Sequence, residues 1–325
     1  MLVMPLFHIH GLVASLFSSL GVGGSVIIPP RFSASKFWED YVTHEATWFS
    51  AVPTIHQIIL KNPIPSPRPS IRFIRSCSSP LPPTVFYALE EKLGAPVLEA
   101  YAMTEAAHQM TSNPLSPGVR RPGSVGVPQG VELHIKDDHG QSVAAGVIGE
   151  VCIRGENVTK GYLNNPEANR STFTPDGFLR TGDQGLLDTD GYLILTGRIK
   201  ELINKGGEKL SPIELDNIFT QHPDVIEAVS FAVADDLYGQ DVGVAIVVKE
   251  KSTLTQEEFV QWVRERAAKF KIPKKVSSQT TWISLILRID HLLILNLGLL
   301  HQSHAENGDR KSSASTRCRS DAQPA

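Results

Sequence analysis

Short apolar runs alternate with longer amphipathic segments over the first hundred residues of the chain. The runs at residues 47–51, 71–77 and 97–100 have the length of buried strands. Apolar residues at helical spacing fill the stretches between and before them. Helices are therefore expected at residues 37–44, 53–60 and 84–93.

The N-terminal segment shows the same alternation of strand and helix patterns. It predicts a buried strand, a helix over roughly residues 10–20 and, after a glycine-rich turn, a second strand at residues 25–28. Alternation of short strands with helices is typical of layered folds in which helices cover a sheet. The first hundred residues therefore predict an α/β domain with a largely parallel sheet.

From about residue 123 the pattern changes to short strands and turns. Strands are expected at residues 131–136, 149–154 and 192–196, separated by turn sequences such as Asp190-Gly191. Such spacing predicts a small antiparallel β-unit attached to the first domain.

A compact α+β pattern follows residue 198. Ser211, Pro212 and Glu214 have the order of an N-cap, a first helical position and a capping-box glutamate. Two strands and a second helix are expected after this helix, at residues 225–234, 242–249 and 256–270. The chain thus divides into a large domain at residues 1–197, a small incomplete domain at 198–276 and a divergent, disordered tail at 277–325.

Residues 282–300 are strongly apolar and raise the question of a membrane span. Arg288, Asp290, His291 and Asn296 lie within this run. A charge at the centre of a span costs about 3 kcal/mol on insertion scales, so we expect no stable membrane insertion. A detached amphipathic helix and a disordered tail both fit the run.

Composition narrows the class of protein. A content of 41% hydrophobic residues is ordinary for a soluble globular chain of 325 residues. The net charge of −3 predicts no general affinity for nucleic acid or anionic lipid. Cys77, Cys152 and Cys318 have spacings that suit neither a disulfide framework nor a metal cluster, so a reducing compartment is expected. The N-terminus has no basic segment of the kind that begins a signal peptide.

The strongest chemical signal is a strand that ends in Tyr101, Thr104 and Glu105. An aromatic ring can stack on a purine and a hydroxyl can bond a phosphate. A carboxylate can hold Mg²⁺ against phosphate oxygens. The same residues also suit a strand end followed by an ordinary helix cap, so this motif alone does not indicate a nucleotide site.

Two further clusters in the sequence also suit a nucleotide. Ser79 and Pro80 follow the strand at residues 71–77, where small residues let a planar base approach the backbone. Thr181, Gly182 and Asp183 form a tight glycine turn, and its carboxylate can accept hydrogen bonds from both ribose hydroxyls.

In order and spacing these clusters resemble the motifs of the acyl-adenylate-forming, or AMP-binding, family, of the acyl-CoA synthetase type. Within it, residues 97–108 and 149–166 most resemble oxalate-CoA ligases and 4-coumarate-CoA-ligase-like proteins. The resemblance implies part of a large adenylate-forming domain followed by a small α+β C-terminal domain. It also implies a reaction in which a small carboxylic acid and ATP, with Mg²⁺, form an acyl-AMP, which coenzyme A converts to an acyl-CoA.

The resemblance also implies roles for individual residues. Tyr101, Ser79 and Pro80 would hold adenine, Thr104 the phosphate, Glu105 the magnesium ion, and Asp183 and Arg198 the ribose. Lys200 would be the hinge between the domains. The loop containing Gly206 and Gly207 would line the CoA tunnel, although a charged surface hairpin also fits it. His8, Ser78 and His108 would form the acyl pocket, although His8 also fits a core position and His108 a helix cap.

The family pattern has two parts that this sequence lacks. Its Ser/Thr/Gly-rich phosphate loop would precede residue 1, and its catalytic lysine would follow Val276, where the chain reads Ser277-Ser-Gln-Thr-Thr-Trp282. We therefore expect a gene model truncated at both ends and a chain inactive in this form. A non-catalytic AMP- or acyl-adenylate-binding remnant and an unstable chain are the alternatives. The family implies a cytoplasmic or peroxisomal location, and the terminal Gln323-Pro-Ala325 is no peroxisomal signal. Oligomeric state stays open.

Overall fold

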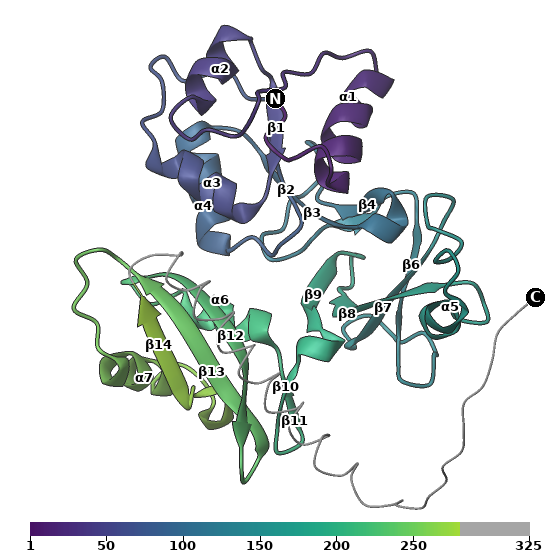
Figure 1. Ribbon diagram of the computed structural model, residues 1–325, viewed down its shortest axis with the longest axis vertical. Helices are drawn as coiled ribbons and strands as arrows, with labels where there is room; N and C mark the ends of the chain where they lie inside the picture. The colour runs from purple at the N-terminus through teal and green to yellow at the C-terminus, as the bar shows by residue number, and fades with distance from the viewer. Residues whose placement is uncertain (280–325) are drawn as a thin grey trace, which may run out of the picture.

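The computed structural model describes residues 1–279, whose strands form three sheets (Figure 1). In the first sheet three strands run parallel, as predicted, and two more continue it antiparallel. The antiparallel half was not predicted. It arises because only a three-residue helical turn separates the third and fourth strands, too short for a parallel crossover. The strands, in sheet order, are β1 (Trp48–Ala51), β2 (Phe73–Ser76), β3 (Val97–Met103), β4 (His108–Ser112) and β5 (Val127–Pro128).

Helices accompany the parallel half of this sheet. The three predicted helices are present, with Pro53 and Pro83 at first helical positions. Aromatic side chains of Phe37, Tyr41 and Phe49 are fully buried and pack edge-on in the core between helix and strand. The helical elements are η1 (His10–Phe17), α1 (Ser18–Gly21), α2 (Phe37–Thr43), α3 (Pro53–Lys61), α4 (Pro83–Leu93) and η2 (Thr104–Ala106).

The N-terminal predictions hold only in part. The expected helix exists, but it begins as the π-helix η1 and becomes α-helical at Ser18. The strand predicted at residues 25–28 is wrong. The Leu2 N–H donates to the Ile27 carbonyl at 3.0 Å. The buried strand predicted at the start of the chain is reduced to a single backbone bridge between Leu2 and Ser50.

The second sheet is the predicted antiparallel β-unit, with one strand more than expected. The strand β8 contains the sequence Thr181-Gly182-Asp183, so the predicted tight turn is wrong. Gly182 has φ +74° within the strand, and the pairing register of the strand shifts on both sides. Polar residues and glycines concealed this strand from pattern analysis. The elements are β6 (Glu132–Lys136), β7 (Gly149–Arg154), α5 (Pro166–Thr172), β8 (Leu179–Leu187), β9 (Leu193–Arg198) and η3 (Ile199–Glu201).

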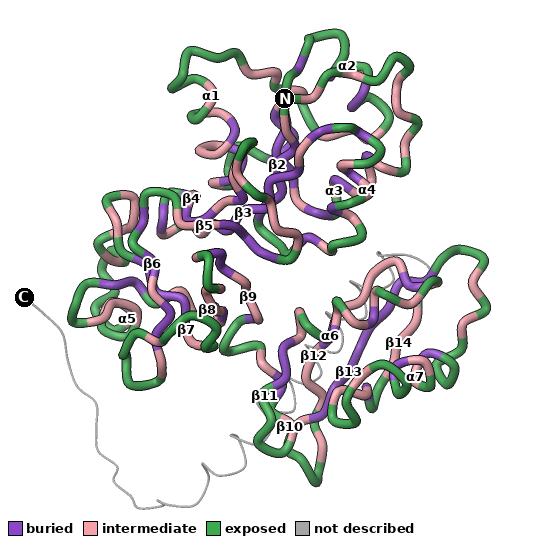
Figure 2. The backbone as a smooth tube through the Cα atoms, turned by 180° about the vertical axis from the view of Figure 1, so that it is seen from behind, coloured by how far each residue is buried: buried purple, intermediate pink, exposed green. Residues whose placement is uncertain are grey.

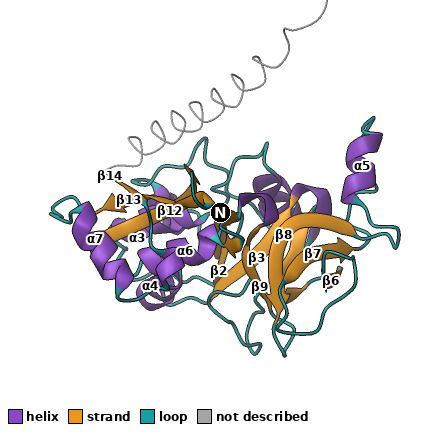
Figure 3. Cartoon of the chain, turned by 90° about the horizontal axis from the view of Figure 1, so that it is seen from below, coloured by secondary structure: helices purple, strands orange, loops and turns teal. Residues whose placement is uncertain are grey.

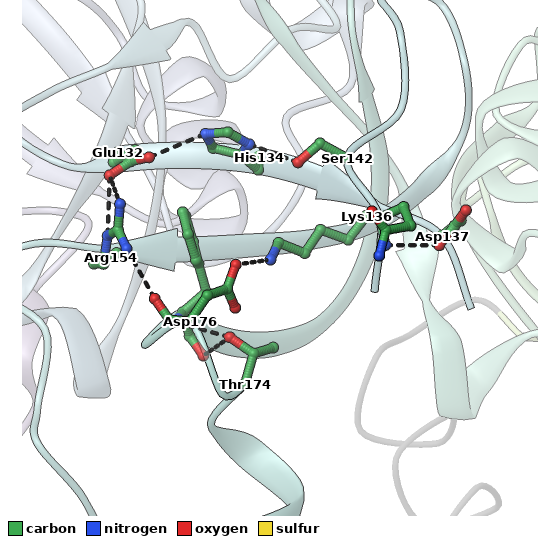
Figure 4. Close-up of polar contacts among 10 residues, drawn as sticks. Glu132, His134, Lys136, Asp137, Ser142, Arg154, Thr174 and Asp176 are labelled. Carbon is green, nitrogen blue, oxygen red and sulfur yellow. Dashed lines mark hydrogen bonds and ion pairs between the residues drawn. The ribbon is translucent and has the colours of Figure 1, made fainter. Parts of the chain in front are cut away.

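A network of charged side chains links strands β6 and β7 of this sheet to the segment before β8 (Figure 4). The Lys136 ammonium and the Arg154 guanidinium each lie 4.4 Å from the centre of the Phe178 ring. Lys136 also pairs with Asp176 at 2.6 Å, and Arg154 pairs with Glu132 at 2.6 Å. Because the Lys136 side chain is only 5% exposed, its ion pair and cation–π contact together satisfy a nearly buried charge.

The third sheet carries the small α+β unit. Ser211 caps the first helix as predicted, and Thr255 forms a capping box with Glu258 on the second. That second helix ends at Arg264 rather than at residue 270. The N–H groups of Arg266 and Ala267 both donate to the Val263 carbonyl, and Ala268, at ψ 146°, precedes a separate short 3₁₀ turn. The elements are β10 (Ile203–Lys205), β11 (Glu208–Leu210), α6 (Pro212–Phe219), β12 (Val225–Asp235), β13 (Gly239–Val248), α7 (Gln256–Arg264), η4 (Lys269–Lys271) and β14 (Lys275–Gln279).

Three main hydrophobic clusters form the core: one under the parallel half of the first sheet, one that joins Tyr101 and Met110 of the first sheet to the second sheet, and one in the third sheet. Figure 2 shows buried backbone running along β2, β3 and β13, and Figure 3 shows α6 and α7 against the third sheet. The domain boundaries after residues 197 and 276 stay predictions. Within residues 1–279, no helix has the length and apolar character needed to cross a bilayer. Residues 277–279, predicted to begin a disordered tail, belong instead to strand β14, which pairs with β13. The expectations for residues 282–300 and for the rest of the tail beyond residue 279 lie outside the described residues.

Candidate functional site

The predicted ribose and adenine residues meet at one place, although they are far apart in sequence. The Tyr101 hydroxyl at the end of β3 donates to Oδ2 of Asp183 on β8. Oδ1 of Asp183 lies 3.3 Å from Nε of Arg198, at the end of β9. Burial raises the pKa of both Asp183 and Tyr101, and the Arg198 charge opposes that rise for each. The three side chains form a hydroxyl–carboxylate–guanidinium cluster that joins the first two sheets.

The predicted phosphate and metal residues lie in the turn between β3 and β4. Thr104 is exposed and Glu105 is half-buried in η2. The Glu105 carboxylate accepts a hydrogen bond from the Tyr162 hydroxyl at 2.8 Å, and its carbonyl accepts one from the Thr159 N–H at 2.7 Å. No group of three metal-ligating side chains occurs among residues 1–279. One carboxylate suits Mg²⁺ held mainly by phosphates and water, so Glu105 fits that role.

The loop after β2 is tied to β3 by a buried carboxylate that the sequence analysis had not selected. Ser78, Ser79 and Pro80 are exposed, and Ser78 has φ +75°. The next N–H, that of Leu81, donates to Oε1 of Glu99 at 2.9 Å. Burial raises the pKa of Glu99 to about 7, while the Leu81 hydrogen bond opposes the rise. Glu99 thus fixes the loop beside the strand that carries Tyr101.

Of the residues predicted for an acyl pocket, His8 lies apart from Ser78 and His108, whereas the neighbouring His10 lies beside both. His8 is exposed, and its Nδ1 accepts a hydrogen bond from the His10 N–H at 3.1 Å. His10 is fully buried, and its Nδ1 lies 3.1 Å from Ser78 Oγ. The sequence offered a signal for this residue, since His10 is the second histidine of the same short motif.

His108 completes the same cluster. It is the first residue of β4, so the helix-cap alternative is wrong. Its ring lies 5.2 Å from that of His10, and its backbone has φ +83°. Both ring nitrogens of His108 are buried without a hydrogen-bond partner among residues 1–279. Burial, and then the charge of Arg75, lower the pKa of His108 to about 2 and that of His10 to about 3.

The predicted hinge and CoA residues belong to the third sheet and to the connection leading into it. Lys200 is exposed in η3 and lines a cavity of 830 Å³ together with residues of β12 and β14. Gly206 and Gly207, at φ +60° and +96°, form the turn of a hairpin between β10 and β11. The hairpin alternative therefore describes their local structure.

Two family models match the chain on either side of this connection. The first, described as AMP-binding enzyme, matches residues 1–163, and the second, described as AMP-binding enzyme C-terminal domain, matches residues 214–280. The chain belongs to the AMP-binding enzyme family. Membership confirms the resemblance drawn from Tyr101, Asp183 and their neighbouring motifs, and with it the α/β fold.

Two curated members of the AMP-binding family are especially similar. The oxalate-CoA ligase of Saccharomyces cerevisiae is 57% identical over 275 residues, covering 84% of this chain and 51% of the relative. The oxalate-CoA ligase of Arabidopsis thaliana is 54% identical over 281 residues, covering 85% and 54%. The chain therefore spans about half the length of the curated relatives it matches.

A solved structure of an AMP-binding enzyme shows the same fold. The crystal structure of ATP-bound MatB from Rhodopseudomonas palustris aligns with a TM-score of 0.81 at 33% identity. The alignment covers 86% of this chain and 56% of the MatB chain. A large N-terminal domain followed by a smaller C-terminal domain is thus the architecture shared with this family.

Proposed function

We propose that this chain carries the adenosine-binding part of an ATP-dependent carboxylate-CoA ligase that acts on a small dicarboxylic acid such as oxalate. The observation that carries the proposal is the meeting of Tyr101, Asp183 and Arg198 beside the Ser78–Pro80 loop. The similarity to two oxalate-CoA ligases supports the choice of acid.

In this proposal the nucleotide binds at the junction of the first two sheets. Asp183 accepts hydrogen bonds from the ribose hydroxyls, and Arg198 balances its charge. The Tyr101 ring and the Ser79-Pro80 backbone hold the adenine. The Tyr101 hydroxyl, which donates to Asp183, keeps that carboxylate in place before the nucleotide arrives.

The phosphate side of the site is the turn after β3. Thr104 would donate a hydrogen bond to the α-phosphate, and Glu105, which accepts a hydrogen bond from Tyr162, would be the protein ligand of Mg²⁺. When bound, the ion would supply positive charge that stabilises the phosphate groups. The ATP-bound state of the related MatB structure supports ATP as the nucleotide.

The reaction has two steps. A carboxylate oxygen of the acid attacks the α-phosphorus of ATP, forming acyl-AMP and releasing pyrophosphate. The thiol of coenzyme A then attacks the acyl carbon and AMP leaves, giving the acyl-CoA. Rotation at Lys200 brings the Gly206-Gly207 turn toward the acyl group for the second step. Ser78, His10 and His108 form the acid pocket, and His8 accepts a hydrogen bond from the His10 N–H.

Binding of AMP to the 325-residue chain tests this assignment. Calorimetry with the Asp183→Ala variant should show an affinity for AMP at least about tenfold lower than that of the wild type, since a hydrogen bond to a charged group contributes about 1.5–3 kcal/mol. Asp138→Ala, in the exposed turn after β6, is the matched control and should bind as the wild type does. Equal affinity in the Asp183 variant would remove this residue from the site.

Pyrophosphate exchange tests whether the chain also catalyses. We expect no exchange above background with ATP and oxalate, because residues 1–325 contain no Ser/Thr/Gly-rich loop to orient the β- and γ-phosphates. AMP binding without exchange would support the alternative of a non-catalytic adenylate-binding remnant for this chain. Robust exchange would contradict the expectation of inactivity, and aggregated material without a cooperative unfolding transition would favour an unstable chain.

A further inference from the structure

A positive charge is buried beside the proposed acid pocket without an acidic partner. Arg75, on β2, is 8% exposed. Its guanidinium contacts neutral oxygens: Nη2 donates to Gln109 Oε1 at 2.8 Å and Nη1 to Ser50 Oγ at 3.5 Å. None of the ion pairs among residues 1–279 includes it. A buried charge without a counter-charge costs several kcal/mol, so an anion should complete this site.

A chain of hydrogen bonds connects Arg75 to the exposed Ser78–Pro80 loop. Ser50 Oγ lies 2.6 Å from His10 Nε2, and His10 Nδ1 lies 3.1 Å from Ser78 Oγ. A guanidinium has donors and no acceptor, so Ser50 accepts from Arg75 and has its own proton for His10 Nε2. His10 then carries its proton on Nδ1 and donates to Ser78. The Ser78 hydroxyl proton is left to point at a ligand.

The histidines of this cluster do not add a charge of their own. Burial lowers the pKa of His10 to about 3 and that of His108 to about 2, and the nearby Arg75 charge lowers both further. At neutral pH both rings are therefore neutral. Among these clustered side chains, Arg75 is the fixed positive charge.

We propose that Arg75 is a specificity-determining residue that selects acids with a second, non-reacting carboxylate. It acts through Ser50 and His10, which aim the Ser78 hydroxyl at that carboxylate, and through its own charge, which the carboxylate balances. This inference rests on the proposed function and adds to it the residue that recognises the second carboxylate of the acid.

Two nucleotide probes separate recognition of charge from recognition of shape. One is N-oxalyl sulfamoyl adenosine, which has a free carboxylate, and the other is its carboxamide counterpart, of nearly the same size. The wild-type chain should bind the carboxylate probe about tenfold more tightly, since a hydrogen bond to a charged group contributes about 1.5–3 kcal/mol. AMP, measured in parallel, reports the nucleotide site alone.

Variants of Arg75 assign the preference to this residue. In Arg75→Met the preference for the carboxylate probe should fall below about threefold while AMP affinity is unchanged, and Arg75→Lys should restore part of it. Arg72→Gln, an exposed arginine on the same segment, is the matched control and should keep the full preference.

The outcomes are distinct. An undiminished preference for the carboxylate probe in Arg75→Met overturns the proposal. Equal binding of the two probes by the wild-type chain also overturns it, and this measurement does not depend on whether the variant folds. Either result with intact AMP binding leaves the proposed nucleotide site standing. Absence of AMP binding in the wild type would overturn both.

Discussion

Glu99 illustrates how a single residue links folding to the site. Its carboxylate is 3% exposed, and Oε1 accepts the Leu81 N–H that anchors the Ser78–Pro80 loop. Oε2 has no hydrogen-bond partner among residues 1–279. The site therefore contains a carboxyl group whose charged form is only half satisfied.

This environment predicts a pH dependence of stability. The pKa of Glu99 rises from 4.5 to about 7 on folding, so between these values the folded chain binds more protons than the unfolded chain. The contribution of Glu99 to the free energy of unfolding is then unchanged below pH 4.5, falls as the pH rises towards 7, and stays low above it. At about 1.4 kcal/mol per pKa unit the loss is at most about 3 kcal/mol.

Glu99→Gln removes this titration and keeps an oxygen for the Leu81 N–H. We expect the variant to be more stable than the wild type at pH 8, with the difference shrinking towards pH 4.5, as measured by urea unfolding across that range. Glu91→Gln, on the exposed face of α4, is the control and should follow the wild type. A pH-independent difference for Glu99→Gln would show that its charge is not the cause.

At the scale of elements, β4 and β5 depend on a close approach of two backbones. A Cβ on Gly126 would lie 1.9 Å from the Ser112 carbonyl carbon, and Gly126 also has φ +84°. Gly123 has the same φ of +84°, but a Cβ there would meet no atom within 4 Å. A side chain at Gly123 would cause backbone strain alone, whereas one at Gly126 would cause backbone strain and a steric clash.

Alanine substitutions should show this difference. Gly123→Ala should cost about 1–2 kcal/mol in the free energy of unfolding, the cost of a left-handed conformation for a residue with a Cβ. Gly126→Ala should cost at least about 2 kcal/mol more, because β4 must also move away from β5. Thermal and urea unfolding give both values, and equal losses would refute the close packing inferred here.

Strand β8 shows why element prediction failed where the site lies. Its sequence Leu-Arg-Thr-Gly-Asp-Gln-Gly-Leu-Leu has apolar residues only at its ends, and its middle suits a turn. Pairing with β7 and β9 holds it extended. Polar and glycine residues in its middle therefore concealed the strand, and such local conflicts between sequence pattern and fold are expected at functional sites.

At the scale of the whole molecule, the segment that connects the second and third sheets is exposed to solvent. Arg198, Ile199, Lys200 and Glu201 are all exposed and form the end of β9 and the short turn η3. The Ser211 hydroxyl, which caps α6, also donates to the Thr196 carbonyl of β9 and joins the two units. A rotation of the small unit at Lys200 would have to break that bond.

An exposed connection of this kind predicts an early proteolytic cut. Within residues 1–279, limited trypsin treatment should cleave first after Arg198 or Lys200, as identified by mass spectrometry of the fragments. Lys200→Gln should confine the cut to Arg198. A first cut in another loop of residues 1–279 would contradict a mobile connection at this point.

The sequence by itself determined the family, the α/β alternation and the capped helices, and it singled out Tyr101, Glu105 and Asp183 as candidates, because each depends on residue type and local spacing. Only the tertiary structure decided which residues meet. It joined Tyr101 to Asp183 across 82 positions of the sequence, placed His10 beside Ser78 and buried Arg75 without an acidic partner among residues 1–279. Contacts of this kind depend on strand register and sheet pairing, which are set by long-range packing and leave no mark on local sequence.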